Sequence, residues 1–297
     1  MKYTKPPLAF FGNKKNQLKS INEVLESMYY DGLITKDTIF YDVFGGSGLV
    51  SHFIKQKFKD NRVIWNDYDD YKSRLDIIDI TESIRKRCSE EITRVDKRQD
   101  LLTEEKRTKL QEILSEYGEE ELDCITLSTY FLFSGNYAKS KDELIAKVKY
   151  NRIAFNPLNA KGYLDGVERV QMDGIDLLKS IEKERESGRA FLVLDPPYLQ
   201  TINGNNAMHF TLKQFLEMIE LITKPFLLFS NKKSDILPFI EFFRKHDKKG
   251  TFKSYTFDKA YNNLGSDDYM IYSCLRRGLF ENGIIDAREK IKETLND

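Results

Sequence analysis

A short loop that begins at Asp195 has the residue types needed to bind an amino group. Asp195 follows the apolar residues 191–194 and precedes Pro196, Pro197 and Tyr198. Proline has no backbone N–H, so the loop offers hydrogen-bond acceptors, namely the Asp195 carboxylate and a carbonyl such as that of Pro196. Two acceptors that hold both hydrogens of an adenine amino group would turn its lone pair toward a methyl sulfonium, while Tyr198 stacks on the base. The loop therefore predicts methylation of an amino group, and the alternative is an ordinary proline turn.

A glycine-rich loop earlier in the chain is typical of a ligand-binding turn. Asp42 ends an apolar segment, and Gly45, Gly46 and Gly48 follow it before a helical stretch. Closely spaced glycines let the backbone approach a ligand, but the spacing differs from GxGxxG, so pyrophosphate binding is not implied. We expect the loop to bind the amino-acid part of a methionine-derived ligand, with Asp42 facing the ligand's ammonium group. The alternative is a structural turn.

Two further acids stand where an α/β sheet would present them to the same ligand. Asp67 lies just beyond the expected strand at residues 62–65 and can accept hydrogen bonds from both hydroxyls of a ribose, as the corresponding acid does in nucleotide-binding sheets. Its alternative role is to cap the next helix. Asp173 is the candidate contact for the adenine of the ligand, and Asp176 competes with it for that role.

The elements that must position these residues alternate between strands and helices. Strands are expected at residues 38–43, 62–65, 190–194, 226–230, 251–257 and 269–274, and helices at residues 48–58 and 212–223. This alternation predicts an α/β fold whose mostly parallel sheet has helices on both faces, with ligands at the carboxyl ends of the strands. The last two strands flank a glycine-containing loop and are expected to form an antiparallel edge.

A region of different composition separates the glycine-rich loop from Asp195. Charged residues dominate residues 71–123, where apolar residues recur with helical spacing, and residues 134–163 combine basic and aromatic side chains. We therefore expect residues 1–70 and 166–297 to form a catalytic domain and residues 71–165 a mainly helical insert. The alternative for residues 71–123 is a solvated helical pair with no direct chemistry, and the alternative for residues 134–163 is a basic helix followed by an ordered loop. The candidate DNA-binding residues of the insert are Lys139, Lys147, Lys149 and Arg152.

The overall composition limits the function classes. The 47 basic and 47 acidic residues give no net charge, so nucleic-acid binding would need a local basic face. Three widely spaced cysteines predict neither a disulfide framework nor a zinc site, and no metal is expected. No apolar run approaches the roughly 20 residues of a membrane span, and no signal peptide is recognisable. These features favour a cytoplasmic protein with no membrane partner and leave its oligomeric state open.

The order of the motifs resembles that of the Dam-like, alpha-group DNA adenine methyltransferases. Phe10-Phe11-Gly12-Asn13-Lys14 fits the FxGxK element that opens this family, and the glycine-rich loop and Asp195 loop follow in the family's order. The resemblance covers residues 8–70 and about 165–200. It implies a Rossmann-like class I methyltransferase fold with a seven-stranded sheet, S-adenosylmethionine as cofactor, and double-stranded DNA with a specific short site as partner.

The resemblance also assigns roles by position. It places Phe10 and Lys14 in the cofactor pocket, Asp67 on the cofactor's ribose, and Asp195 and Tyr198 on a flipped-out target adenine, with Asp195 also bordering the cofactor. Target recognition would lie between the glycine-rich loop and Asp195. Residues 150–157 look like a degraded form of the family's RxNxxGxFNxP-type segment.

Other substrates and an inactive relative are the competing hypotheses. Similar loops occur in methyltransferases that act on ribosomal-RNA guanine or on protein glutamine, but the FxGxK start and the long insert disfavour both classes. A catalytically inactive DNA-binding relative is disfavoured because Asp195, Tyr198, Asp67 and the glycines are all present. We therefore predict a site-specific DNA adenine-N6 methyltransferase.

Overall fold

The computed structural model describes residues 3–92, 101–153, 156–197, 210–231, 236–246, 255–261 and 267–273. The chain divides into two compact units. The first comprises Met1–Thr4, Lys14–Tyr68 and Leu164–Asp297, and the second comprises Lys5–Asn13 and Asp69–Tyr163. Lys5–Asn13 belongs to the second unit, and its Leu8 and Ala9 hydrogen-bond to Tyr71 and Thr126, which lie far along the chain.

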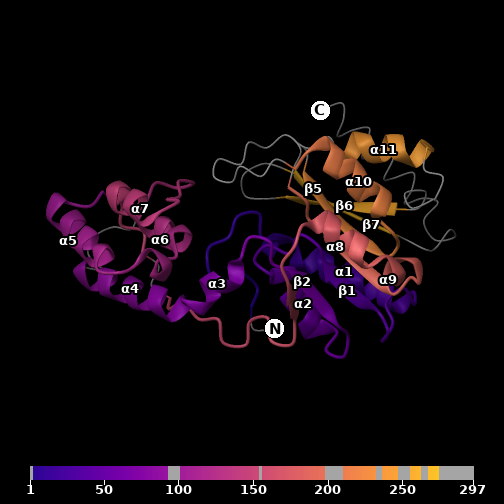
Figure 1. The fold of residues 1–297 in the computed structure, drawn as a ribbon, viewed down its shortest axis with the longest axis horizontal. Helices are drawn as coiled ribbons and strands as arrows, with labels where there is room; N and C mark the ends of the chain where they lie inside the picture. Colours follow the sequence, from indigo (N-terminus) through magenta and orange to yellow (C-terminus); the bar gives the residue numbers. More distant parts are fainter. Residues whose placement is uncertain are drawn as a thin grey trace. The chain divides into compact units, whose positions relative to one another are not determined.

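The first unit contains a mixed sheet. Its described strands are β1 (Ile39–Asp42), β2 (Val63–Asn66), β3 (Glu168–Val170), β4 (Ala190–Leu194), β5 (Phe226–Asn231), β6 (Tyr255–Tyr261) and β7 (Asp267–Ser273). They form a seven-stranded sheet in the order β3-β2-β1-β4-β5-β7-β6, and Figure 1 labels β1, β2, β5, β6 and β7. The pairs from β3 to β5 are parallel, and β7 runs antiparallel to both β5 and β6. The predicted α/β class, mostly parallel sheet and antiparallel edge are confirmed.

Strand β3 was missed by the sequence analysis. Its residues Glu168, Arg169 and Val170 are half-buried or exposed and lack an apolar run, because β3 lies at the edge of the sheet. It is identified by its parallel pairing with β2, from Ile64 opposite Glu168 to Asn66 opposite Val170. This short strand brings Arg169 to the predicted ligand-binding edge.

Helices pack on the sheet through alternating side chains of the strands. The helices of the first unit are α1 (Leu18–Tyr30), α2 (Leu49–Lys57), α8 (Gly174–Ser180), α9 (Glu182–Glu186), α10 (Leu212–Leu221) and α11 (Ile236–His246), with the 3-10 turn η1 (Lys15–Gln17). One apolar cluster joins Ile39, Tyr41 and Leu192 of the strands to side chains of α8, α10 and α11. Phe40 lies on the other face and stacks on Phe58. Since side chains alternate along a strand, Asp42 lies on the same face as Phe40.

The second unit is helical. It contains α3 (Tyr71–Asp76), α4 (Ile78–Glu91), α5 (Glu104–Ser115), α6 (Cys124–Phe131) and α7 (Lys141–Lys147), with the 3-10 turn η2 (Glu119–Glu121). Buried side chains from α4 to α7, including Ile84, Leu110, Leu127 and Leu144, form a separate core. The insert therefore has a hydrophobic core of its own.

Candidate active site

The glycine-rich loop after β1 is a tight turn packed against Trp65. A Cβ on Gly45 would lie 2.2 Å from Trp65 Cδ1, so no larger residue fits there without movement. Trp65 Nε1 donates a hydrogen bond to the Gly46 carbonyl at 3.2 Å. Gly48 has φ +73°, which favours glycine, and immediately precedes α2. The glycines thus serve the close approach of the loop to β2, a reason that the sequence does not reveal.

Asp42 is a buried carboxyl group at the end of β1. Asp42 is 3% exposed, and Ser51 Oγ on α2 donates a hydrogen bond to Asp42 Oδ2 at 2.6 Å. Burial raises the pKa of Asp42 to about 7; the nearby charge of Asp195 adds to this rise, whereas the Ser51 hydrogen bond and Lys14 oppose it. The carboxyl group is therefore close to its titration point at neutral pH. A cation placed beside it would favour the ionised form.

Asp67 follows β2 and forms an ion pair with a strand residue that sequence reasoning missed. Its side chain is completely buried, and Arg169 Nε donates to Asp67 Oδ2 at 2.8 Å. The alternative role of Asp67 as a helix cap is not observed, because the residue that precedes α3 is Asp70. Beside it, Asn66 Nδ2 donates to the carbonyls of Val43 and Met172, both at 2.9 Å. Asn66 thus joins the ends of β1, β2 and β3 at one edge.

Asp195 follows β4 and forms an ion pair with Lys14. The side chain of Lys14 is 7% exposed and that of Asp195 is 24% exposed, so the pair is largely shielded from solvent on the lysine side. Lys14 Nζ also lies 5.3 Å from the centroid of the Phe229 ring on β5. Pro196 and Pro197 follow outside any helix or strand. Tyr198 lies outside the described residues, and its role stays a prediction.

Asp173 caps helix α8. Its Oδ1 accepts hydrogen bonds from the backbone N–H of Ile175 at 2.8 Å and of Asp176 at 3.3 Å. Asp176 is exposed in the first turn of the same helix. A Cβ on Gly174 would lie 2.6 Å from Phe44 Cε1, so this helix start packs directly on the glycine-rich loop. The role of Asp173 toward an adenine stays a prediction.

The structure places Phe10 and the basic candidates in the second unit. Phe10 packs edge-on against Tyr71, with ring centroids 5.6 Å apart. Glu143 contacts both Lys139 and Lys147. Its carboxylate accepts a hydrogen bond from the backbone N–H of Lys139 and forms an ion pair with the Lys147 ammonium. Lys149 and Arg152 donate their backbone N–H groups to carbonyls at the end of α6. The four basic residues therefore gather around α6 and α7.

The described part of the chain contains no group of three or more His, Cys, Asp or Glu side chains arranged to hold a metal ion. Among the helices that the structure describes, none combines the length and apolar content needed to cross a bilayer.

The sheet and the acids at its carboxyl edge define a class of protein. A mostly parallel sheet with an antiparallel β7, and acids after β1, β2 and β4, has the architecture of a Rossmann-like methyltransferase. The profile of the D12 class N6 adenine-specific DNA methyltransferases matches residues 10–235. The chain belongs to this family.

A relative agrees with this assignment. The chain is 34% identical over 261 residues to a Haemophilus influenzae protein named "Putative methyltransferase", and the match covers 85% of each chain. The matching length shows that the two proteins share both the sheet region and the insert.

Proposed function

We propose that this protein transfers a methyl group from S-adenosylmethionine to the N6 amino group of an adenine that is flipped out of double-stranded DNA at a specific short site. The observation that carries the proposal is Asp195, a partly exposed carboxylate at the end of β4 that is paired with the buried Lys14 and followed by two prolines. Family membership supports DNA adenine as the substrate.

The residues at the strand ends fit the chemical groups of the cofactor. Asp42 is a buried acid for an ammonium group, and Asp67 is a buried acid for the hydroxyls of a ribose. Asp173 borders the glycine-rich loop through Gly174 and Phe44. S-adenosylmethionine supplies a methyl group on a positively charged sulfur, which is already activated for transfer.

Asp195 would orient the adenine and help to remove a proton. Both oxygens of its carboxylate can accept hydrogen bonds, and the ion pair with Lys14 fixes the position of this group. Pro196 and Pro197 carry no N–H that would compete for acceptors. The nitrogen becomes cationic when it takes the methyl group, and Asp195 Oδ1 or Oδ2 would accept the proton that it then releases. Tyr198 would stack on the base.

The second unit would provide DNA binding and target recognition. The chain has no net charge, so affinity for DNA must come from a local basic surface. Lys139, Lys147, Lys149 and Arg152 gather around α6 and α7, and Tyr137 lies close enough to Arg152 to interact with its charge. These residues would contact the phosphate backbone.

A methyl-transfer assay with base analysis tests the proposal. The protein is incubated with methyl-labelled S-adenosylmethionine and mixed-sequence duplex DNA, and the digested nucleosides are separated by mass. We expect the label in N6-methyladenine with the wild type and none above background with Asp195→Ala. Label in cytosine, in RNA or in added protein in place of adenine would contradict the proposal.

A further inference from the structure

The FxGxK element connects two differently held parts of the chain. Lys5–Asn13 belongs to the second unit, whereas Lys14 belongs to the first, where it pairs with Asp195. Gly12 and Asn13 separate Phe11 from Lys14 in the sequence. How the second unit holds the residues before Lys14 therefore bears on the chemistry proposed for Asp195.

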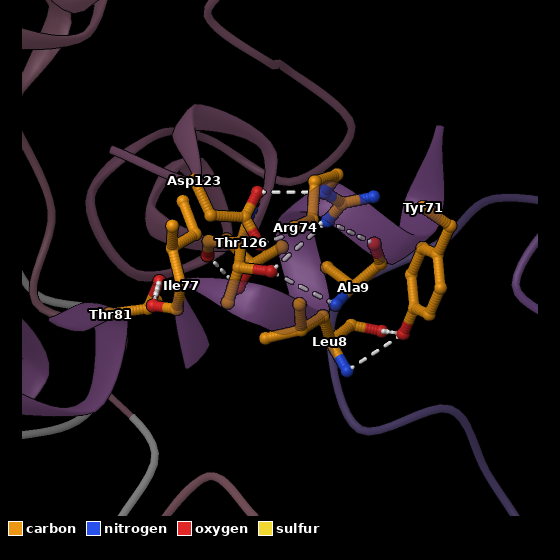
Figure 2. Close-up of polar contacts among 9 residues, drawn as sticks. Leu8, Ala9, Tyr71, Arg74, Ile77, Thr81, Asp123 and Thr126 are labelled. Carbon is orange, nitrogen blue, oxygen red and sulfur yellow. Dashed lines mark hydrogen bonds and ion pairs between the residues drawn. The ribbon is translucent and has the colours of Figure 1, made fainter. Parts of the chain in front are cut away.

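Side chains of the second unit bind the backbone of Leu8 and Ala9 (Figure 2). The Tyr71 hydroxyl accepts the Leu8 N–H at 3.0 Å and donates to the Leu8 carbonyl at 3.2 Å. Thr126 Oγ1 accepts the Ala9 N–H at 3.1 Å, and Arg74 Nη2 donates to the Ala9 carbonyl at 2.7 Å. Both backbone polar groups of two consecutive residues are thus satisfied by three side chains. We call Tyr71, Arg74 and Thr126 the anchor.

The anchor is itself held rigidly. Arg74 makes a two-point contact with Asp123, from Nε to Oδ1 at 3.0 Å and from Nη2 to Oδ2 at 3.1 Å. Asp123 Oδ1 also accepts the backbone N–H of Thr126, which fixes the start of α6. The Arg74 guanidinium lies over the Tyr71 ring at 5.1 Å. Because these groups are buried or nearly so, the anchor is preorganised, and the Arg74 guanidinium faces the Asp123 carboxylate.

Aromatic contacts extend this hold toward Lys14. Phe10 packs on the ring of Tyr71, and Phe11 packs edge-on against Tyr137 with ring centroids 4.1 Å apart. Asn13 Nδ2 donates to the Phe10 carbonyl at 2.8 Å. Lys14 follows Asn13 directly in the chain, so the backbone that these contacts hold is covalently continuous with the lysine that pairs with Asp195.

We propose that Tyr71, Arg74 and Thr126 are positioning residues that hold the FxGxK element so that Lys14 stays on Asp195. The inference rests on the proposed function, because it takes Lys14 and Asp195 as parts of the methyl-transfer site. The hydrogen bonds that define the anchor go to the backbone of Leu8 and Ala9. The anchor residues act through this backbone.

The test uses conservative variants that remove single oxygen atoms. Tyr71→Phe removes both bonds to Leu8 but keeps the ring, and Tyr130→Phe, at an equally buried tyrosine of the same unit, is the matched control. Thr126→Val removes the acceptor for Ala9, and Thr126→Ser keeps it. The readouts are the melting temperature, the calorimetric affinity for S-adenosylmethionine, and kcat/KM for methyl transfer, each in the wild-type and Lys14→Met backgrounds.

The result that supports the inference is non-additivity with Lys14. We expect Tyr71→Phe and Thr126→Val to lower cofactor affinity and kcat/KM about tenfold each, the scale of one or two lost buried hydrogen bonds. Tyr130→Phe and Thr126→Ser should stay within about twofold of the wild type. In the Lys14→Met background, Tyr71→Phe should add less than about twofold, because the side chain that the anchor positions is already gone.

Three outcomes would overturn the inference. If the effects of Tyr71→Phe and Lys14→Met simply multiply, the anchor has a general structural role and does not act through Lys14. If Tyr71→Phe and Thr126→Val behave like the wild type, the anchor positions nothing of consequence. If Lys14→Met itself binds cofactor and transfers methyl normally, both this inference and the role proposed for Lys14 fail. Methyl transfer to adenine would then still support the proposed function, so the failure of the inference is distinguishable from the failure of that function.

Discussion

The charged side chains proposed for catalysis and for DNA binding are held differently in the two units. In the first unit, Asp42, Asp67 and Asp195 end neighbouring strands, and each contacts a partner from another element. In the second unit, Lys147 is 51% exposed and pairs with Glu143 one turn away on the same helix. Buried charges interact strongly and are screened little by salt, whereas exposed charges are worth little individually and are screened. Substitutions of the buried acids at the strand ends should therefore change chemistry, and those of the exposed basic residues in the second unit should change salt-dependent DNA affinity.

The largest effect is expected at Asp195. Asp195→Asn keeps the shape of the side chain but removes its charge and one acceptor, so methyl transfer should fall roughly 10²–10³-fold or more, as for loss of a preorganised polar group at a reacting centre. Single-turnover transfer to duplex DNA measures the effect. A variant that retains more than about a tenth of wild-type transfer would show that the β4 edge does not carry the chemistry.

The ion pair adds a stability effect that must be separated from this loss. Asp195→Asn removes the partner of the buried Lys14 cation, so the melting temperature should also fall. Adding Lys14→Met removes the second charge and should restore part of that stability without restoring transfer. Recovery of transfer in the double variant would mean that stability, not chemistry, limited the single one.

The next effect is a pH dependence set by Asp42. Burial raises its pKa to about 7, so Asp42 is mostly protonated below that pH and mostly ionised above it. Because the ionised form would bind the cofactor's ammonium group, which itself begins to lose its proton near pH 8, affinity for S-adenosylmethionine should rise about fourfold between pH 6 and pH 8, with proton release at pH 6. Calorimetry in buffers of different ionisation enthalpy measures both quantities.

Two variants control this prediction. Asp42→Asn should bind weakly and independently of pH over the same range. Ser51→Ala removes a hydrogen bond that lowers the pKa of Asp42, so the rise in affinity should move to higher pH. A wild-type affinity that is flat from pH 6 to pH 8 would refute the role of Asp42.

A smaller effect, confined to DNA binding, is expected in the second unit. Combined charge reversal of Lys147, Lys149 and Arg152 should weaken duplex binding at least about tenfold near 0.1 M salt and reduce the salt slope by about 2–3. Lys147 should contribute least, because Glu143 already pairs with it. Anisotropy titrations over a salt series measure the slope. Lys19→Glu, at a 90% exposed lysine of the first unit, is the control, and an unchanged slope in the triple variant would place the DNA elsewhere.

The smallest effect is expected for the stability contributed by two ion pairs of the first unit. Arg169 pairs with the buried Asp67, whereas Arg62 pairs with the exposed Glu168 on the same strand as Arg169. Arg169→Ala should lower the free energy of unfolding by about 1–2 kcal/mol, allowing for the 34% exposure of Arg169, and Arg62→Ala by less than about 1 kcal/mol. Urea unfolding measures both. Equal losses would mean that burial does not distinguish the two pairs.

Much of the sheet could be predicted because its strands are apolar runs that end in chemistry-bearing residues. The five residues of β4 are all buried, and Asp195 follows at once, so motif and element coincide in the sequence. Strand β3 could not be predicted, because an edge strand of three residues has no apolar pattern. Arg169 was missed for the same reason.

The contacts that cross long stretches of sequence also escaped prediction. Composition changes near residue 70 and so suggested a boundary there, but the Leu8 and Ala9 backbones bind Tyr71 and Thr126. No local pattern links these residues. Likewise the glycine at position 45 could be assigned to a ligand-binding turn from sequence, whereas its need to accommodate Trp65 depends on the pairing of β1 with β2.

Sequencing of methylated adenines is the most direct test of site-specific adenine methylation through Asp195. DNA would be taken from a host that lacks adenine methylation and expresses either the wild type or Asp195→Asn. We expect N6-methyladenine in one short recurring sequence with the wild type and none with the variant. Unmodified adenines with the wild type would contradict DNA adenine methylation, and equally full methylation by the variant would contradict the role of Asp195.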